Sequence, residues 1–337
     1  MKDACARTID YLRVSITDRC NLRCLYCMPA HGIPKVKHDD ILRFDEIITV
    51  VRVASRLGVR HIRLTGGEPL VRKGVVQLIE EIRAIPGIDD ISLTTNGVLL
   101  APMAHELRRA GLDRINISLD TFDPDQYRTI TRCGDIRHVL EGIDAALDEG
   151  FDPVKINAVA VRNLHQDFYS YARSSIDRPL HMRFIEYMPI GDSAGINDIG
   201  WGPQDIVSCE DIRKEIDREA VKRGEGPLYA LSTADRPYGS GPASYWKFPD
   251  AKGTVGFISP ISHQFCLGCN RIRLSAQGGI RPCLFSDEEY PIRDVVRYGT
   301  EHDVEDVLLR AIAHKPRERR DVLQAHATKK NMNAIGG

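Results

Sequence analysis

Strand-like and helix-like segments alternate between residues 11 and 187, and this alternation constrains the fold more than any other feature of the chain. The strand-like segments are apolar or β-branched runs at Leu12–Thr17, His61–Thr65, Ile91–Thr94, Arg114–Asp120, Val154–Val161 and His181–Ile185. Segments with helical spacing of apolar residues lie between them, at Asp45–Leu57 (Asp45 as a cap), Val75–Ile85, Pro102–Ala110, Ile136–Leu147 and Asp167–Ser174. Six βα units with short links predict an α/β fold with a parallel sheet, curled into a partial (βα)6 TIM-like barrel.

The pattern changes after Ile190. Residues 191–203 are glycine-rich and irregular, which is typical of a linker. The segments that follow are a short helix, strands with turns, a longer helix and a polar tail, at Cys209–Arg218, Leu228–Ser259, Asp294–Ala313 and up to Gly336–Gly337. We therefore expect a barrel domain at 1–190, a linker at 191–205 and a smaller C-terminal α+β domain at 206–337.

Bulk composition excludes several classes of protein. The 337 residues are 42% apolar and 28% charged, and the formal net charge is −1. This total gives no reason to expect nucleic acid or a membrane surface as a partner. We find no apolar run long enough to span a bilayer, and residues 1–10 contain no apolar signal segment. The expected compartment is the cytoplasm.

Nine cysteines are unusual for a protein of a reducing compartment, where thiols serve metals or catalysis more often than disulfides. Six of them form two spaced triplets. The other three, Cys5, Cys133 and Cys209, stand alone, and we interpret them as ordinary thiols without a role.

The first triplet is Cys20, Cys24 and Cys27, directly after the first strand-like run. Loops that follow the strands form the active-site face of a parallel barrel. Three thiolates would leave one iron of a four-iron cluster open, as a catalytic metal site requires. The alternative is a structural zinc loop completed by His31 or His38.

The second triplet is Cys266, Cys269 and Cys283, and again a fourth thiol is missing. A zinc knuckle completed by His263 is the alternative here. Arg271 and Arg273 follow at once and would share one face of a strand. Two guanidinium groups on one face suit an oxyanion such as a phosphate, although a solvated basic patch remains possible.

Four cations lie within the barrel strands, each flanked by apolar residues: Arg13, Arg63, Lys155 and Arg183. Alternation then points their side chains into the barrel, unless the register slips by one residue. Unpaired charges are costly there, so we expect an anionic substrate. The alternative is internal neutralisation by Asp18, Asp120 or Glu186.

The first triplet also carries a family resemblance. Cys20-Asn-Leu-Arg-Cys24-Leu-Tyr-Cys27 resembles the signature of the radical S-adenosylmethionine superfamily, and Thr65-Gly66-Gly67-Glu68-Pro69-Leu70 is similar to its glycine-rich motif. The resemblance implies that the open iron of a [4Fe–4S] cluster chelates S-adenosylmethionine. Reduction then gives methionine and a 5′-deoxyadenosyl radical. The glycines would let the backbone approach the methionyl amino group.

Both triplets together, with Cys269-Asn-Arg-Ile-Arg273 and Cys283-Leu-Phe285, resemble the GTP 3′,8-cyclase family of molybdenum cofactor biosynthesis over nearly the whole chain. The resemblance implies a lyase with two [4Fe–4S] clusters. The radical would abstract the hydrogen at C3′ of GTP, and the sugar radical would attack C8, giving (8S)-3′,8-cyclo-7,8-dihydroguanosine 5′-triphosphate. The second cluster would bind the guanine. A reductant protein, a downstream cyclic pyranopterin monophosphate synthase and a homodimer are also implied.

Residue roles follow from the same resemblance. The implied GTP contacts are Arg13, Arg63, Thr94, Lys155, Arg183, Arg271 and Arg273. The implied S-adenosylmethionine contacts are Tyr26, Gly66, Gly67, Glu68, Ser118 and Met188. The implied catalytic set is Cys20, Cys24, Cys27, Arg271, Arg273, Gly336 and Gly337, with the terminal glycines reaching into the active site.

Two other functions stay open. One is a radical enzyme of another substrate class, such as a peptide-modifying protein with auxiliary clusters. Such proteins usually carry more C-terminal cysteines than the three found here after Cys209. The other is a zinc-stabilised binding module with basic grooves and no catalytic activity.

Overall fold

A computed structural model describes residues 1–34, 36–190 and 201–325 of the chain. The described strands form one sheet in the order β12-β11-β10-β1-β2-β3-β4-β5-β6-β9-β8-β7. Its central six strands run parallel in chain order: β1 (Tyr11–Ser15), β2 (His61–Thr65), β3 (Asp90–Thr95), β4 (Arg114–Ser118), β5 (Val154–Ala160) and β6 (Leu180–Glu186). The predicted partial barrel of six units is thereby confirmed.

Strands from the second half of the chain extend this sheet at both edges. On one side β10 (Arg271–Leu274) lies parallel to β1, and on the other β9 (Thr254–Ile258) lies parallel to β6. The outermost strands are antiparallel: β7 (Tyr229–Ala230), β8 (Ser244–Lys247), β11 (Gly279–Arg281) and β12 (Tyr290–Pro291). The division into two domains at 190 and 206 stays a prediction, because pairing is continuous across it.

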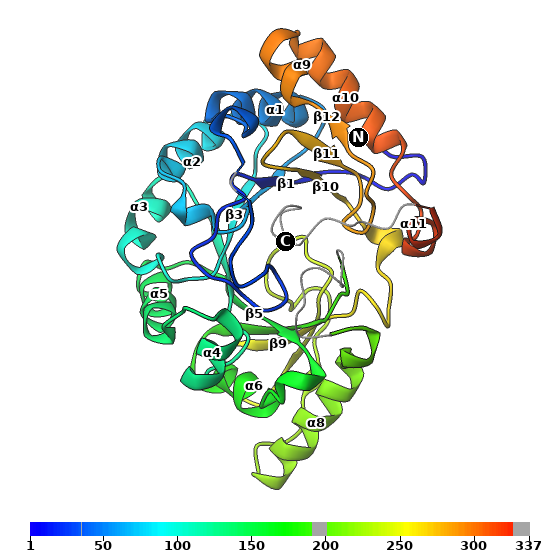
Figure 1. The fold of residues 1–337 in the computed structure, drawn as a ribbon. Coiled ribbons are helices and arrows are strands. Elements are labelled where there is room, and N and C mark those ends of the chain that lie inside the picture. Colours follow the sequence, from blue (N-terminus) through cyan, green and yellow to red (C-terminus); the bar gives the residue numbers. More distant parts are fainter. Residues whose placement is uncertain (35, 191–200, 326–337) are drawn as a thin grey trace.

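Helices lie on the outside of the curved sheet (Figure 1). Those of the first half are α1 (Phe44–Arg56), α2 (Val75–Arg83), α3 (Ala104–Arg109), α4 (Pro124–Thr131), α5 (Ile136–Asp148) and α6 (Phe168–Asp177). Those of the second half are α8 (Cys209–Lys222), α9 (Arg293–Tyr298), α10 (Glu301–Ala313) and α11 (Arg319–Ala325). Short 3-10 turns cover His38–Asp40, Pro69–Val71, Ala101–Met103, Arg162–Leu164, Pro203–Asp205 and Cys266–Gly268.

Three details differ from the sequence-based expectations. Asp45 is not the cap of α1: Arg43 precedes the helix, and Glu46 accepts the backbone N–H of Arg43 at 2.7 Å. The predicted helix 294–313 is two helices, because Thr300 caps a new one. Helix α4 was not predicted, although Asp123 and Pro124 form a regular cap and first position.

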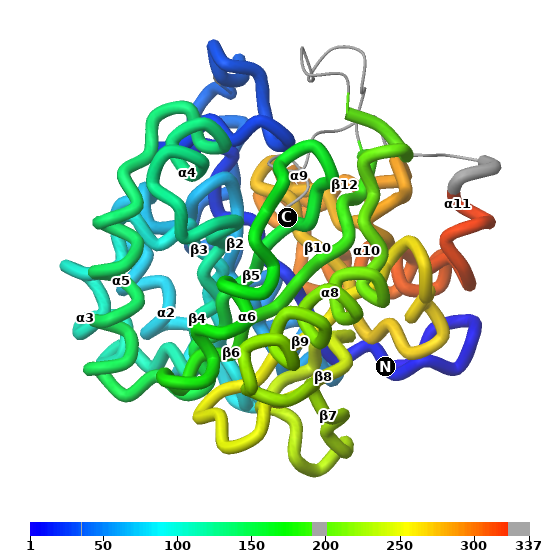
Figure 2. Tube along the Cα trace, turned by 90° about the horizontal axis from the view of Figure 1, so that it is seen from below, coloured from blue at the N-terminus to red at the C-terminus, as the bar shows by residue number. Residues whose placement is uncertain are grey.

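The core joins the two halves of the chain. Apolar side chains on the inner faces of α1, α2 and α5 pack against the sheet and are fully or nearly fully buried. Phe184 on β6 lies against Phe168 and Tyr171 of α6 and stacks on Phe257 of β9, with ring centroids 5.2 to 5.9 Å apart. Figure 2 shows β9 beside β6, so this cluster continues the barrel core into the C-terminal half. Within the described ranges, no helix is long and apolar enough to cross a membrane.

Candidate functional site

Both cysteine triplets line a single cavity of about 320 Å³. The cavity, here called the chamber, lies where β1 to β6 end, and its wall continues through residues that follow β9 and through β10. The two triplets therefore face the same space although more than two hundred residues separate them in the sequence. Among the residues that the structure describes, no three His, Cys, Asp or Glu side chains converge on one metal ion. A [4Fe–4S] cluster does not require such convergence, because each cysteine binds a different iron.

The loop of the first triplet is held in place by a helix end and by a buried acid. Arg132, which follows α4 with φ of +64°, donates to the carbonyls of Arg23 at 3.0 Å and Met28 at 2.9 Å. Tyr26 donates its hydroxyl to Asp120 at 2.6 Å. These contacts fix the loop at both sides of Cys24 and Cys27 before any ligand binds.

The glycines after β2 allow two loops to touch. A Cβ at Gly67 would lie 2.3 Å from the carbonyl oxygen of Arg19, and one at Gly66 would lie 2.4 Å from that of Thr17. The backbone N–H of Gly67 donates to Thr17 at 2.7 Å. Only glycine fits this approach, so the pair brings backbone polar groups beside the first triplet.

Glu68 does not line the chamber. Its carboxylate accepts hydrogen bonds from the backbone N–H groups of Leu70 at 3.0 Å and Asn96 at 2.6 Å, and from the Thr95 hydroxyl at 2.7 Å. Burial raises the pKa of Glu68 to about 7 against the effect of these bonds. The Glu68 carboxylate thus holds the glycine loop to the end of β3, and the expected contact of this residue with S-adenosylmethionine stays a prediction.

The two triplets differ in their electrostatic surroundings. Burial raises the pKa of Cys20, raises that of Cys24 further and raises that of Cys27 to about 12. Burial also raises the pKa of Cys269, but Lys315 and Arg271 outweigh burial and lower it to about 6. Burial also raises the pKa of Cys266, so within the second triplet it is Cys269 that lies next to cations strong enough to outweigh burial.

Three arginines form a row across neighbouring strands. Arg13 on β1 is the register partner of Arg273 on β10 and of Arg63 on β2. All three line the chamber, and Arg13 and Arg63 thereby have the inward direction expected from alternation. Burial lowers the pKa of all three guanidinium groups. The positive charge of Arg273 lowers the pKa of Arg13 further. The positive charge of Arg271 acts in the same way on Arg273, whose pKa falls to about 10. We call Arg13, Arg63 and Arg273 the arginine row.

Two of the three acids suspected of neutralising these cations, Asp120 and Glu186, have other partners, and Asp18 is buried without an ion pair to a chamber cation among the described residues. Asp120 accepts from Tyr26 and from the backbone N–H of Val159 at 2.8 Å. Glu186 accepts from the backbones of Cys209, Ile261 and Ser262 at 2.9 to 3.0 Å. Arg63 and Arg183 instead donate to neutral oxygens, on Ser92 at 3.1 Å and on Asn116 at 2.6 Å. The positive charge of the chamber therefore favours an anionic ligand.

Lys155 lies apart from the other predicted GTP contacts. It is buried on β5 but does not line the chamber, and its ammonium donates to the carbonyl oxygen of Tyr238. Arg114 lies over the Tyr238 ring at 5.1 Å and pairs with Asp90. Burial, with the nearby charge of Arg183, lowers the pKa of Lys155 to about 5.

The remaining predicted contacts fall into two groups. Tyr26, Gly66, Gly67, Thr94, Ser118, Arg183, Met188 and Arg271 line the chamber together with the cysteines. Gly336 and Gly337 lie outside the described residues. The structure adds lining residues that the sequence reasoning did not assign, including Asn96, Asp120 and Asn157. Their signal is position: Asn96 and Asp120 are polar and come just after β3 and β4, and Asn157 is a polar residue in the middle of the otherwise mostly apolar β5.

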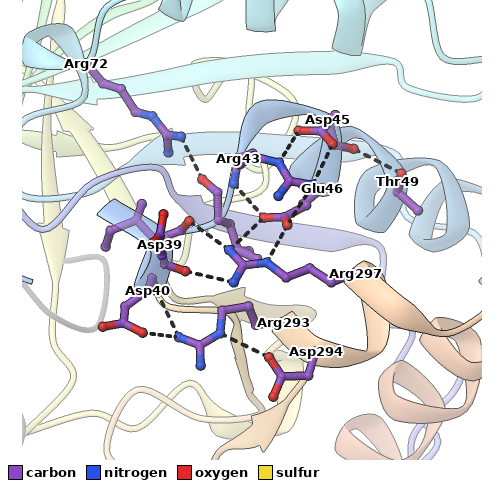
Figure 3. A network of polar contacts seen from close by, with 12 residues as sticks. Asp39, Asp40, Arg43, Asp45, Glu46, Thr49, Arg72, Arg293, Asp294 and Arg297 are labelled. Atoms are coloured by element: carbon purple, nitrogen blue, oxygen red, sulfur yellow. Dashed lines mark hydrogen bonds and ion pairs between the residues drawn. The ribbon is translucent and has the colours of Figure 1, made fainter. Parts of the chain in front are cut away.

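Helix α9 holds the segment that follows the first triplet (Figure 3). Arg297 donates to the buried carboxylate of Glu46 at 2.6 Å and to the carbonyl oxygen of Asp39 at 2.8 Å. Arg293 donates to the Asp40 carboxylate at 3.1 Å. The C-terminal half thereby stabilises the segment after the first cluster loop, in addition to pairing with β1, the strand before that loop.

Comparison with protein families gives two adjoining matches. Residues 14–170 match the radical SAM superfamily, and residues 180–320 match the family described as Molybdenum Cofactor Synthesis C. The chain is 46% identical over 339 residues to a protein of Pelotomaculum thermopropionicum named GTP 3′,8-cyclase, with 100% of both chains covered. A protein of the same name from Moorella thermoacetica is 48% identical over 320 residues, covering 94% of each chain.

Solved structures support the fold. Streptococcus suis SuiB bound to S-adenosylmethionine matches with a TM-score of 0.59 at 15% identity, covering 85% of this chain and 64% of that one. The structure titled native anSMEcpe with bound AdoMet also matches with a TM-score of 0.59 at 15% identity, covering 93% of this chain and 82% of that one. At this identity the likeness concerns the arrangement of the strands and helices alone.

Proposed function

The chain belongs to the GTP 3′,8-cyclase family of radical S-adenosylmethionine enzymes, and from this membership we propose how its own residues perform the reaction. The enzyme is a lyase that converts GTP into (8S)-3′,8-cyclo-7,8-dihydroguanosine 5′-triphosphate, the first step of molybdenum cofactor biosynthesis. One observation carries the assignment of roles: both cysteine triplets and the arginine row line the same chamber. Substrate and radical source can then meet in one enclosed space.

The first triplet fits a [4Fe–4S] cluster that keeps one iron open. Cys20, Cys24 and Cys27 would bind three irons, and no fourth cysteine lines this end of the chamber among the described residues. With S-adenosylmethionine bound, such a cluster supplies the 5′-deoxyadenosyl radical that removes the hydrogen at C3′ of GTP. The protein supplies position and exclusion of water.

Residues around the first triplet would hold S-adenosylmethionine. The Gly66–Gly67 backbone lies against the cluster loop and offers polar groups to the methionyl end, while Tyr26, Ser118 and Met188 line the same wall. Tyr26 is fixed by Asp120. Asn96 joins this group, because its amide lies 3.8 Å from the Cys20 sulfur and bonds Asn21 at 2.7 Å.

The arginine row would bind the triphosphate. Its three guanidinium groups, with Arg271 from the same face of β10, offer paired donors to phosphate oxygens. Thr94 and Arg183 line the same cavity and would complete the set. Lys155, which does not line the chamber, would contribute a further positive charge. It would reach the triphosphate only after releasing the Tyr238 carbonyl.

The second triplet would carry the cluster that orients the guanine. Cys266, Cys269 and Cys283 line the chamber beside Arg271 and Arg273, so a base bound there would leave the triphosphate on the arginines. His263, the fourth ligand of a zinc knuckle, does not line the chamber; its ring nitrogen lies 3.1 Å from the Ser262 hydroxyl. This arrangement favours the cluster over the knuckle.

Further parts of the proposal rest on family membership alone. They are a reductant protein, a downstream cyclic pyranopterin monophosphate synthase that takes the product, a homodimer and a cytoplasmic location. The insertion of Gly336 and Gly337 into the active site belongs to the same group, since glycines offer no side chains that would clash with ligands.

Anaerobic turnover tests the proposal. Protein reconstituted with iron and sulfide should contain about eight irons per chain and, with dithionite, S-adenosylmethionine and GTP, should release 5′-deoxyadenosine and the cyclised triphosphate. Two zincs per chain and no 5′-deoxyadenosine would support the binding module instead. Release of 5′-deoxyadenosine without consumption of GTP would support a radical enzyme of another substrate class.

A further inference from the structure

Four distant segments of the chain meet around two buried cations next to the second triplet. The segments are residues 3–7, 266–271, 282–283 and 315–319, and the cations are Arg7 and Lys315. Figures 1 and 2 both show the N-terminal segment beside the C-terminal helices α10 and α11. None of these contacts belongs to the roles described above.

Lys315 links the two segments next to β10 and β11 that carry Cys269 and Cys283. The residue follows α10 and is 5% exposed. Its ammonium donates to the carbonyl oxygens of Arg271 and Pro282, both at 2.7 Å. Arg271 comes two residues after Cys269, and Pro282 comes directly before Cys283. One side chain therefore sets the spacing between the segments that contribute two of the three thiols.

Arg7 fixes the third thiol to the same place. Its guanidinium donates to the carbonyl oxygen of Cys266 at 2.9 Å and to those of Lys315, Pro316 and Arg317 at 3.3, 2.8 and 3.2 Å. Asp3 pairs with the Arg7 side chain at 2.6 Å. Arg7 thereby connects Cys266 to the segment that begins at Lys315. The segments that carry all three thiols are therefore hydrogen-bonded to Lys315 or to Arg7 beside it.

The charge of Lys315 has a clear counterpart. Its two hydrogen-bond acceptors are neutral carbonyls. Burial, and then Arg273 and Arg7, disfavour its positive charge, whereas the thiolates of Cys269 and Cys283 attract it. A buried ammonium with neutral acceptors is costly unless a negative charge lies nearby. Three thiolates around a [4Fe–4S] core bring such a charge, and one-electron reduction increases it.

We propose that Lys315 is a positioning residue of the second cluster, which holds the segments carrying Cys269 and Cys283 together and whose positive charge raises the reduction potential of the cluster. The inference rests on the proposed function, since it needs a cluster at the second triplet. A cation beside a redox centre stabilises the reduced form, because that form carries the more negative charge. Loss of the charge should therefore move the potential to more negative values.

The experiment isolates the second cluster. The parent is the full chain with Cys20, Cys24 and Cys27 changed to Ala, reconstituted anaerobically. Lys315→Met removes the charge at similar length, Lys315→Arg keeps it, and Lys222→Met changes an exposed lysine on α8 as a matched control. Iron content and the reduction potential, followed by electron paramagnetic resonance, are measured for each. In the chain with all cysteines, Lys315→Met should still release 5′-deoxyadenosine, which checks that the barrel is folded.

We expect about four irons per chain in the parent, in Lys222→Met and in Lys315→Arg, with similar potentials. Lys315→Met should lose part of the cluster, and the cluster that remains should have a more negative potential. Full iron content at the parent potential in Lys315→Met would overturn the inference, as would equal losses in Lys315→Met and Lys315→Arg. A parent that binds no iron would instead contradict the proposed function, whatever the variants do.

Discussion

Arg13 and Arg273 are register partners on adjacent parallel strands, and Arg63 is the partner of Arg13 on the other side. Like charges placed opposite one another on a sheet destabilise it, and burial adds to the cost. The cost of such a row would be offset by a bound polyanion, which indicates a site for an anionic ligand.

Removal of Arg273 should weaken GTP binding. A charge-assisted hydrogen bond contributes about 1.5–3 kcal/mol, so Arg273→Ala should raise the Kd for GTP by about tenfold or more. Arg273→Lys keeps the charge without the paired donors, so its Kd for GTP should lie between those of the native protein and Arg273→Ala. Equilibrium binding to the anaerobic protein measures the effect. Arg60→Ala, which removes one partner of an exposed ion pair with Asp89, is the control and should bind GTP normally. Unchanged affinity in Arg273→Ala would remove Arg273 from the substrate site.

The first triplet should be the sole radical source. Cys24→Ala should abolish release of 5′-deoxyadenosine with dithionite and S-adenosylmethionine and should lower the iron content by about four per chain, because a cluster needs its third thiolate. Liquid chromatography and iron analysis measure the two effects. Cys133→Ala is the matched control: this exposed thiol lies 3.6 Å from the Asn21 carbonyl but lines no part of the chamber. Continued release from Cys24→Ala would locate the radical chemistry elsewhere.

The buried Asp90–Arg114 pair should make stability depend on pH. Burial raises the pKa of Asp90, but interactions with His61 and Arg114 outweigh burial and lower it to about 2. The unfolded pKa is about 3.9. The stabilisation is therefore complete above about pH 4 and is lost as the pH falls towards 2. Breaking a buried pair costs about 3–5 kcal/mol, so Asp90→Asn should lower the free energy of unfolding by that amount at pH 7.

Urea unfolding of the cluster-free protein between pH 2.5 and 7 measures this dependence. The difference between the native sequence and Asp90→Asn should shrink as the pH falls below about 4. Asp89→Asn changes the preceding, exposed carboxylate and should cost no more than about 0.5 kcal/mol at any of these pH values. A constant difference at all pH values would mean that Asp90 is not the titrating group.

The contact between Arg297 and Glu46 should stabilise the segment after the first cluster loop. Arg297→Ala leaves the buried carboxylate of Glu46 with only the exposed Arg43 as a cationic partner, so we expect a loss of about 1–3 kcal/mol and faster amide hydrogen exchange in residues 38–46. Arg52→Ala removes an exposed contact between α1 and Glu301 of α10, the helix after α9, and should cost less than about 0.5 kcal/mol. Equal effects of the two substitutions would show that burial of Glu46 is not decisive.

The barrel could be predicted from the sequence because the periodicity that identifies each strand and helix lies within that element. Six strands and five helices of the first half follow from the periodicity of apolar residues, and the inward direction of Arg13 and Arg63 follows from alternation within a strand. The fold class and the chamber were therefore predictable. Helix α4 was not predicted because only a few of its residues are apolar, although Asp123 is a typical N-cap residue.

Contacts between distant segments left no such signal. The pairing of β10 with β1, which completes the arginine row, joins residues about 260 positions apart, and periodicity says nothing about which strands become neighbours. The same applies to Lys315 and Arg7, whose partners are backbone carbonyls of other segments. The three hydrogen bonds that the protein gives to the Glu68 carboxylate were likewise not predictable, because two of the donors lie at Thr95 and Asn96, in another segment.

Isotope transfer from GTP tests most directly whether substrate and radical meet in the chamber. The anaerobic, fully loaded enzyme is incubated with dithionite, S-adenosylmethionine and GTP that carries deuterium at C3′, and the 5′-deoxyadenosine is analysed by mass spectrometry. We predict that it contains one deuterium and that the cyclised triphosphate is formed alongside it. Release of unlabelled 5′-deoxyadenosine while the labelled GTP remains unchanged would contradict a shared chamber for the two reactants.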